Sequence, residues 1–123
     1  MLTLKLPFPP TVNNLYVNLR GARGGRFPSK GYKAWRERAA VAIRRQAPEP
    51  IKGAVMLNIE LGRPDRRRRD LSNYVKALED ALVQHGLIED DSMVQSLSVS
   101  WGSTPGATLR VWPYTGERMG QAA

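Results

Sequence analysis

The chain has 123 residues and a mass of 13.7 kDa, which is the size of one small domain. Its 19 Lys and Arg against 11 Asp and Glu give a formal net charge of +8 and a pI near 10.4, which favours nucleic acid or an acidic membrane as a partner. The chain has no Cys, so disulfides, thiolate zinc sites and Cys nucleophiles are excluded.

The first residues predict a strand and then a basic loop. Residues 2–6 alternate Leu with Thr and Lys, which is the period of a half-buried strand, and the prolines that follow end it. We expect this strand to lie at a sheet edge. Residues 11–28 lack the spacing of a phosphate-binding loop and predict a mobile surface loop, whose arginines can grip a phosphodiester backbone.

The start of the chain is too short and too interrupted by Pro for a secretory signal, and no apolar run approaches the length that spans a membrane. We therefore expect a cytoplasmic protein with no membrane partner.

A helix and a strand occupy the middle of the chain. Ser29 is expected to cap a basic, amphipathic helix that ends near Gln46, before two prolines. Residues 54–61 predict a central strand, because Val, Leu, Ile and Leu at the odd positions alternate with Ala, Met, Asn and Glu at the even ones.

A second helix is expected to begin at Asp70 and to end near His85, before Gly86. Its core stripe has helical spacing and consists of Leu71, Tyr74, Val75, Leu78 and Leu82.

Two last strands complete the predicted fold. One carries Leu97, Val99 and Trp101 in alternation with serines, the other is centred on Leu109 and Val111, and residues 102–106 make the turn between them. We expect an α+β (mixed α/β) fold, a single domain over residues 1–113 with a small mixed sheet of about four strands and two main helices. Residues 114–123 have little to bury and are expected to form a flexible tail.

Four consecutive arginines precede Asp70 and form the most basic stretch of the chain. Their mutual repulsion is best relieved by an external polyanion, through contacts with several phosphates. The alternative is a solvated loop in which the arginines pair in part with neighbouring acids. The predicted phosphate contacts are Arg66, Arg67, Arg68 and Arg69.

Two acids could form a metal site beside this run. A helix from Asp70 to residue 85 would be about 22 Å long, so Asp91 starts far from Asp70. The two carboxylates can meet only if the segment after Gly86 folds back along the helix, or if a second subunit supplies one of them. Were they to meet, a divalent cation between them would suit Mg²⁺-assisted hydrolysis of a phosphodiester, with a nearby Lys stabilising developing charge.

The motifs just described resemble the RusA family of Holliday junction resolvases. The resemblance rests on residues 64–73 (Pro-Asp-Arg-Arg-Arg-Arg-Asp-Leu-Ser-Asn), on Lys76, on Asp90-Asp91, and on the opening Leu-Pro-Phe-Pro-Pro at residues 6–10 followed by Asn13-Asn14. It extends over nearly the whole chain.

The resemblance implies a homodimer that binds branched DNA and nicks two strands symmetrically, with Mg²⁺ (or Mn²⁺ as a substitute) and no small-molecule cofactor. It places the catalytic residues at Asp70, Lys76 and Asp91. The family's second acid is replaced by Ser72, whose neutral hydroxyl is a weak ligand or lies outside the metal's direct ligands. Asp90, Glu89 and Asp80 are the candidates to compensate, and water is the alternative. The further predicted DNA contacts are Asn14, Arg20, Arg23, Arg26 and Asn73.

The sequence thus predicts a junction-resolving endonuclease of DNA recombination and repair. A noncatalytic or catalytically impaired nucleic-acid-binding protein, such as an RNA-binding or architectural module, is the alternative. It fits the net charge equally well and agrees with the loss of the acid at Ser72, but it does not account for acids placed beside the arginines.

Overall fold

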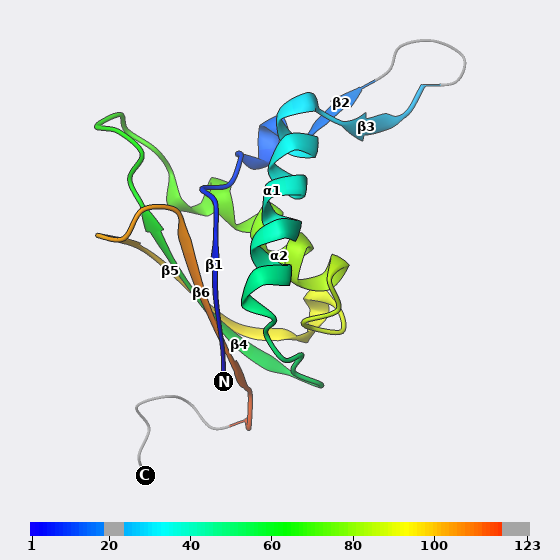
Figure 1. Ribbon diagram of the computed structural model, residues 1–123, viewed down its shortest axis with the longest axis vertical. Coiled ribbons are helices and arrows are strands. Elements are labelled where there is room, and N and C mark those ends of the chain that lie inside the picture. The colour runs from blue at the N-terminus through cyan, green and yellow to red at the C-terminus, as the bar shows by residue number, and fades with distance from the viewer. Residues whose placement is uncertain (19–23, 117–123) are drawn as a thin grey trace.

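A mixed four-stranded sheet forms the framework of the computed structural model, which describes residues 1–18 and 24–116 (Figure 1). The strand order is β1-β6-β4-β5; β1 and β4 each run antiparallel to β6, and β4 runs parallel to β5. The bounds of the strands are β1 Leu2–Leu6, β4 Val55–Gly62, β5 Val94–Gly102 and β6 Ala107–Pro113.

Two helices cover one face of this sheet: α1 (Lys30–Gln46) and α2 (Val75–Gln84). The strand registers place Leu4, Ile59 and Leu109 on one face, and all three are buried in a single core with Trp35 of α1 and Leu78 of α2. Residues that alternate with them, such as those at positions 3, 58 and 98, lie on a polar face that no helix covers. The predicted fold class is confirmed, with both helices on the same side.

The strand over residues 2–6, the helix capped by Ser29 and the central strand are confirmed. The Ser29 hydroxyl accepts a hydrogen bond from the Tyr32 amide at 3.1 Å, and α1 ends at Gln46, followed by Ala47 in the left-handed conformation. The Trp35 indole donates to the Pro7 carbonyl at 3.0 Å and fixes the proline-rich segment after β1 against α1.

The second helix is shorter than predicted. Residues Leu71–Tyr74 form a 3₁₀ helix, η2, and α2 begins only at Val75. Asp70 has an extended backbone and makes no side-chain capping bond, so the predicted start of the helix at this residue is wrong. The sequence of η2 explains the difference, because Ser72 and Asn73 are weak helix formers and the tighter turn carries Tyr74 into the core.

The segment over residues 11–28 is more ordered than the predicted loop. It contains a 3₁₀ turn, η1 (Val12–Asn14), and two short antiparallel strands, β2 (Tyr16–Asn18) and β3 (Arg26–Pro28). Strands of three residues are too short to show an alternating pattern, so the sequence gives no signal for them. The predicted contacts Arg20 and Arg23 lie outside the described residues, as does the tail from residue 117 onward.

Residues 102–106 do join the last two strands, but these strands are not neighbours, because β4 lies between them. The connection crosses the end of β4, where the Gly62 amide donates to the Gly106 carbonyl at 2.9 Å. A Cβ on Gly62 would lie 2.1 Å from the Thr104 carbonyl oxygen, so this crossing requires glycine. No helix among the described residues is long and apolar enough to cross a membrane.

Candidate functional site

The arginine loop, residues 63–69, follows β4 and is organised by Asp65. The Asp65 carboxylate accepts hydrogen bonds from the Arg67 amide at 2.9 Å, from Arg67 Nε at 3.2 Å and from Arg69 Nη2 at 2.7 Å. These bonds, that from Arg69 first, hold the pKa of Asp65 well below its usual range. The loop is therefore a shaped structure in which one acid balances part of the positive charge.

Arg69 differs from the other arginines of the run because it faces the protein. Its side chain is 18% exposed, against 79% for Arg67. Besides its bond to Asp65, it donates to Tyr74 Oη at 3.1 Å, and its guanidinium carbon lies 6.0 Å from the Phe8 ring centre. These hydrogen bonds, that to Tyr74 first, raise the pKa of Arg69. Arg69 thus ties the loop to the core.

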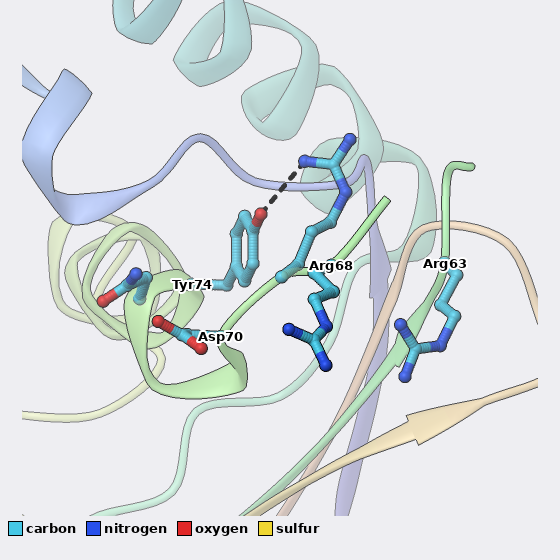
Figure 2. Close-up of a pocket in the computed structure, with 6 residues that line it drawn as sticks. Arg63, Arg68, Asp70 and Tyr74 are labelled. Atoms are coloured by element: carbon cyan, nitrogen blue, oxygen red, sulfur yellow. Dashed lines mark hydrogen bonds between the residues drawn. The ribbon is translucent and has the colours of Figure 1, made fainter. Parts of the chain in front are cut away.

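A hollow of about 590 Å³, here called the arginine hollow, opens where this loop meets η2 (Figure 2). Asp70 is the one acid among its lining residues, which are otherwise cationic or neutral, so the hollow suits an anion. The Arg63 guanidinium stacks 4.3 Å from the Trp101 ring centre and extends the cationic rim over β5. The lining residues are Arg63, Arg68, Arg69, Asp70, Asn73 and Tyr74.

A second hollow of about 590 Å³, the lysine hollow, lies along α2 and has mixed charge. Lys76 Nζ lies 3.0 Å from Asp80 Oδ1 and 3.8 Å from Asp91 Oδ2. The hydrogen bond to Asp80 raises the pKa of Lys76, which keeps the ammonium charged. The lining residues are Tyr16, Arg26, Lys76, Asp80, Val83, Gln84, Asp90 and Asp91.

The segment after α2 folds back along the helix, one of the two routes that the sequence left open. A 3₁₀ turn, η3 (Asp91–Met93), brings Asp91 beside Lys76, and Asp90 caps this turn by accepting from the Ser92 amide at 3.1 Å and from the Ser92 hydroxyl. Those hydrogen bonds lower the pKa of Asp90. The carboxylate of Asp90 is therefore already used as a cap.

Glu79 is an acid of this region that the sequence did not indicate. Burial is the first cause of its raised pKa, and the negative charges of Asp91 and Asp80 add to it while Lys76 opposes it. The signal in the sequence is weak, because Glu79 is one of several acids on an amphipathic helix. The lysine hollow thus has an acid beside it that holds its proton more readily than an ordinary Glu.

The fold-back does not bring Asp91 into the hollow that holds Asp70. Asp70 lines the arginine hollow and Asp91 the lysine hollow, while Ser72 is exposed on η2 between them in the chain. Within residues 1–18 and 24–116, no three His, Asp or Glu side chains come together as a metal-ligand group. The described part of one chain therefore does not assemble the predicted Asp70 and Asp91 pair with a third acid.

Two of the other predicted DNA contacts line the hollows, and a third lies on η1. Asn73 lines the arginine hollow, and Arg26 lines the lysine hollow, with its guanidinium 4.2 Å from the Tyr16 ring centre. Asn14 lies exposed on η1, where its carbonyl accepts from the Ser29 hydroxyl at 2.7 Å. Arg63, which the sequence did not single out, joins this set as the first residue after β4.

Comparisons with known proteins show which family the chain is similar to. A family model described as Endodeoxyribonuclease RusA matches residues 7–112. The chain is 38% identical over 93 residues to the crossover junction endodeoxyribonuclease RusA of Escherichia coli strain K12, covering 75% of each chain. It is 38% identical over 92 residues to that of Enterobacteria phage 82, covering 74% of each, and 31% identical over 107 residues to that of Enterobacteria phage HK97, covering 86% of this chain and 88% of the relative.

Proposed function

This chain belongs to the RusA family of endodeoxyribonucleases, and from that premise we propose that it binds four-way (Holliday) DNA junctions and resolves them by paired symmetric nicks. Such an activity serves DNA recombination and repair and is exercised in the cytoplasm, where the DNA substrate lies. We assign it to one domain over residues 1–113.

The observation that carries the proposal is the pair of hollows, one cationic with Asp70 in its lining and one with Lys76 beside Asp91. A DNA backbone is a regular row of negative charges, so a cationic hollow draws a phosphate toward Asp70. Arg63 and Arg68 are exposed on its rim and can contact phosphates without breaking an internal bond.

Lys76 is the group best placed to act on developing charge. Its ammonium stays protonated, it is partly exposed, and Asp80 and Asp91 hold it in position. A fixed cation near the scissile phosphate stabilises the extra negative charge of the transition state more than the charge of the ground state. We therefore assign Lys76 as the electrostatic catalyst.

We assign Mg²⁺ as the cofactor, with Mn²⁺ as a substitute, because Asp70, Asp91 and the Ser72 hydroxyl offer the hard oxygen donors that these ions prefer. The described residues of one chain do not converge on a single ion, since Asp70 and Asp91 line different hollows. We propose that a metal site from these acids takes an acid of a second subunit.

A homodimer meets this need and also the stoichiometry of the reaction. Two symmetric nicks require two equivalent sites, and a two-fold axis supplies them. In such a dimer, Asp91 of one copy would complete the arginine hollow of the other.

The experiment is a cleavage assay on a synthetic four-way junction with each strand labelled in turn. We expect paired nicks in opposite strands that require Mg²⁺ or Mn²⁺ and stop with a chelator, and no cleavage of the matched linear duplexes. Asp70→Asn is the control for a contaminating nuclease, because it keeps the size of the side chain and removes its charge. Cleavage that survives this substitution would contradict the proposal.

A second function is favoured by one observation, the neutral Ser72 where the family pattern expects an acid. A chain that binds junctions selectively and never nicks them in Mg²⁺ or Mn²⁺ would be a structure-selective binding protein. Binding that prefers RNA over branched DNA would instead favour the RNA-binding alternative.

A further inference from the structure

The small ribbon formed by β2 and β3 projects from the body of the protein. Figure 1 shows it extending away from the four-stranded sheet, beside the start of α1. Its base is held by two bonds: the Ser29 amide donates to the Leu15 carbonyl at 2.9 Å, and the Ser29 hydroxyl donates to the Asn14 carbonyl at 2.7 Å. Leu15 is buried in the core and Ser29 caps α1, so the ribbon rises from a firm base.

The two faces of this ribbon differ in character. In the antiparallel register Val17 lies opposite Phe27, Asn18 lies opposite Arg26, and opposed residues share a face. Tyr16 lies on the same face as Asn18 and Arg26, because side chains alternate along a strand. Tyr16 is half-buried, and with Arg26 it lines the lysine hollow. This inner face, polar and cationic, is therefore the one turned toward the hollow.

The outer face presents an apolar pair to solvent. Val17 is 43% exposed and Phe27 is 38% exposed. Single exposed apolar side chains are ordinary on a protein surface, but two that lie side by side on a projecting ribbon gain stability by meeting another apolar surface. Lys33 Nζ of α1 lies 5.9 Å from the Phe27 ring centre, so a cation stands beside the pair. An aromatic ring flanked by a cation matches the chemistry of a DNA base and its phosphate.

A branch point in DNA offers a surface for each face of the ribbon. In a linear duplex, the neighbouring base pairs cover every base from above and below. Where arms meet, a strand leaves one arm for another, and a base at that point can lose a stacking neighbour. A ribbon placed there meets a phosphate backbone on one side and the flat face of a base on the other. Apolar side chains that enter between bases are a general means by which proteins open or bend DNA.

We propose that the β2–β3 ribbon is the element that distinguishes a DNA junction from a linear duplex. Its inner face, with Asn18 and Arg26, contacts the backbone of the strand that is led to the lysine hollow. On the outer face, Val17 and Phe27 cover the base that is left unstacked beside this strand. The inference rests on the proposed function, which takes junctions as the substrate. It adds a source of selectivity, because the arginine hollow attracts phosphates, and phosphates are present in every DNA.

The first arm of the test compares binding to a synthetic four-way junction with binding to a linear duplex of matched sequence. Gel-shift titrations are made with a chelator present, so that no strand is cut. The double variant Val17→Ser/Phe27→Ser removes both apolar side chains and keeps the net charge. We expect its affinity for the junction to fall about tenfold or more, because the contact with the unstacked base is lost. Its affinity for the duplex should stay unchanged.

Two further variants are the controls for this arm. Val12 on η1 is 42% exposed, close to the value for Val17, and lies outside the ribbon, so Val12→Ser should leave both affinities unchanged. Phe27→Tyr keeps an aromatic face and should keep the preference for the junction, whereas Phe27→Ser should lose most of it. Thermal melts show whether each variant is folded. If the double variant is not folded, Val17→Ser and Phe27→Ser decide as single variants.

The second arm reports on the base itself. A 2-aminopurine base next to the branch point fluoresces more strongly when it loses its stacking neighbours. Saturating wild-type protein should raise this fluorescence, and saturating Val17→Ser/Phe27→Ser protein should not. The same probe in the middle of an arm should respond to neither protein. Because both proteins are saturating, the signal separates a failure to unstack the base from a loss of affinity.

The outcomes separate the role of the ribbon from the activity. If the wild type prefers junctions without nicking them and the double variant loses that preference, the ribbon's role is supported and the proposed nicking is contradicted. If the wild type nicks junctions and the double variant keeps both the preference and the fluorescence rise, the ribbon's role is overturned and the function stands. Equal affinity of the wild type for junction and duplex would overturn the ribbon's role, as would an equal loss from Val12→Ser.

Discussion

The arginine hollow and the lysine hollow have the same volume, and they organise charge in opposite ways. In the first, an internal set of bonds from Arg69 to Asp65 and Tyr74 holds a cationic rim open to solvent. In the second, Lys76 is flanked by Asp80 and Asp91, so positive and negative groups already balance each other. On the proposed function, the first hollow attracts the DNA backbone and the second acts on it.

The largest effects should come from the one acid that each hollow contributes to the proposed chemistry. Asp70→Asn and Asp91→Asn should each lower the rate of junction nicking about 10³-fold or more. Junction affinity should stay equal or rise, because each change removes a negative charge that faces the DNA. Single-turnover cleavage and gel-shift titration on the same preparations measure the two quantities.

Equal losses from both acids would show that the hollows work as one site. If Asp91→Asn cleaves at the normal rate while Asp70→Asn is inactive, the lysine hollow has no part in cleavage and the division of roles drawn above is wrong.

Lys76→Ala tests the role of the ammonium group in the lysine hollow. We expect the turnover rate to fall about 10²-fold with little change in binding, because a fixed charge that acts on the transition state affects kcat more than KM. Lys76→Arg is the matched control, since it keeps a positive charge at this position. An equal loss from both variants would contradict the assignment of Lys76 as the electrostatic catalyst.

Ser72→Asp tests whether residue 72 contributes a ligand to the metal. A carboxylate is a far better ligand for a hard cation than a hydroxyl, so the variant should bind Mg²⁺ more tightly and nick junctions faster. Ser72 is exposed on η2, and stability should stay within about 0.5 kcal/mol. Metal titrations of the nicking rate, beside a thermal melt, check both. Unaltered rates at every metal concentration would remove residue 72 from the site.

The arginines of the loop offer a smaller, graded test. Arg68 is exposed at the rim, so Arg68→Ala should reduce the slope of log affinity against log salt by about 1 and leave the melting temperature unchanged. Arg69 is tied to Tyr74 and Asp65, so Arg69→Ala should lower the melting temperature and change the salt slope less. Identical behaviour would mean that the inward orientation of Arg69 does not persist in solution.

Sequence and structure agree where a local pattern is sufficient. The alternation of Leu2, Leu4 and Leu6 and the capping Ser29 are local signals, and the strand and helix they predict are present. The difference between Arg68 and Arg69 depends on Tyr74, which is distant in space until η2 forms, so four identical side chains in a row could not reveal it. Asp70 and Asp91 line different hollows, and this likewise depends on how far the segment after α2 folds back. The number of residues between the two acids limits that distance but does not determine it.

The smallest expected effect concerns Asp65, which shapes the arginine hollow without lining it. Hydrogen bonds from Arg69 and Arg67 depress the pKa of this carboxyl in the folded protein, so the folded state binds its proton less readily than the unfolded chain. Its contribution to stability is therefore fully present above the unfolded pKa of about 3.9 and is lost as the pH falls toward the folded pKa. Asp65→Asn should lower the melting temperature slightly at neutral pH and flatten its decline below about pH 4, since no proton is then taken up at this position. Melting curves of both proteins at successive pH values measure this. Parallel curves for wild type and Asp65→Asn would show that the loop is held by Tyr74 and the core, and that the order of the arginine hollow does not depend on its own acid.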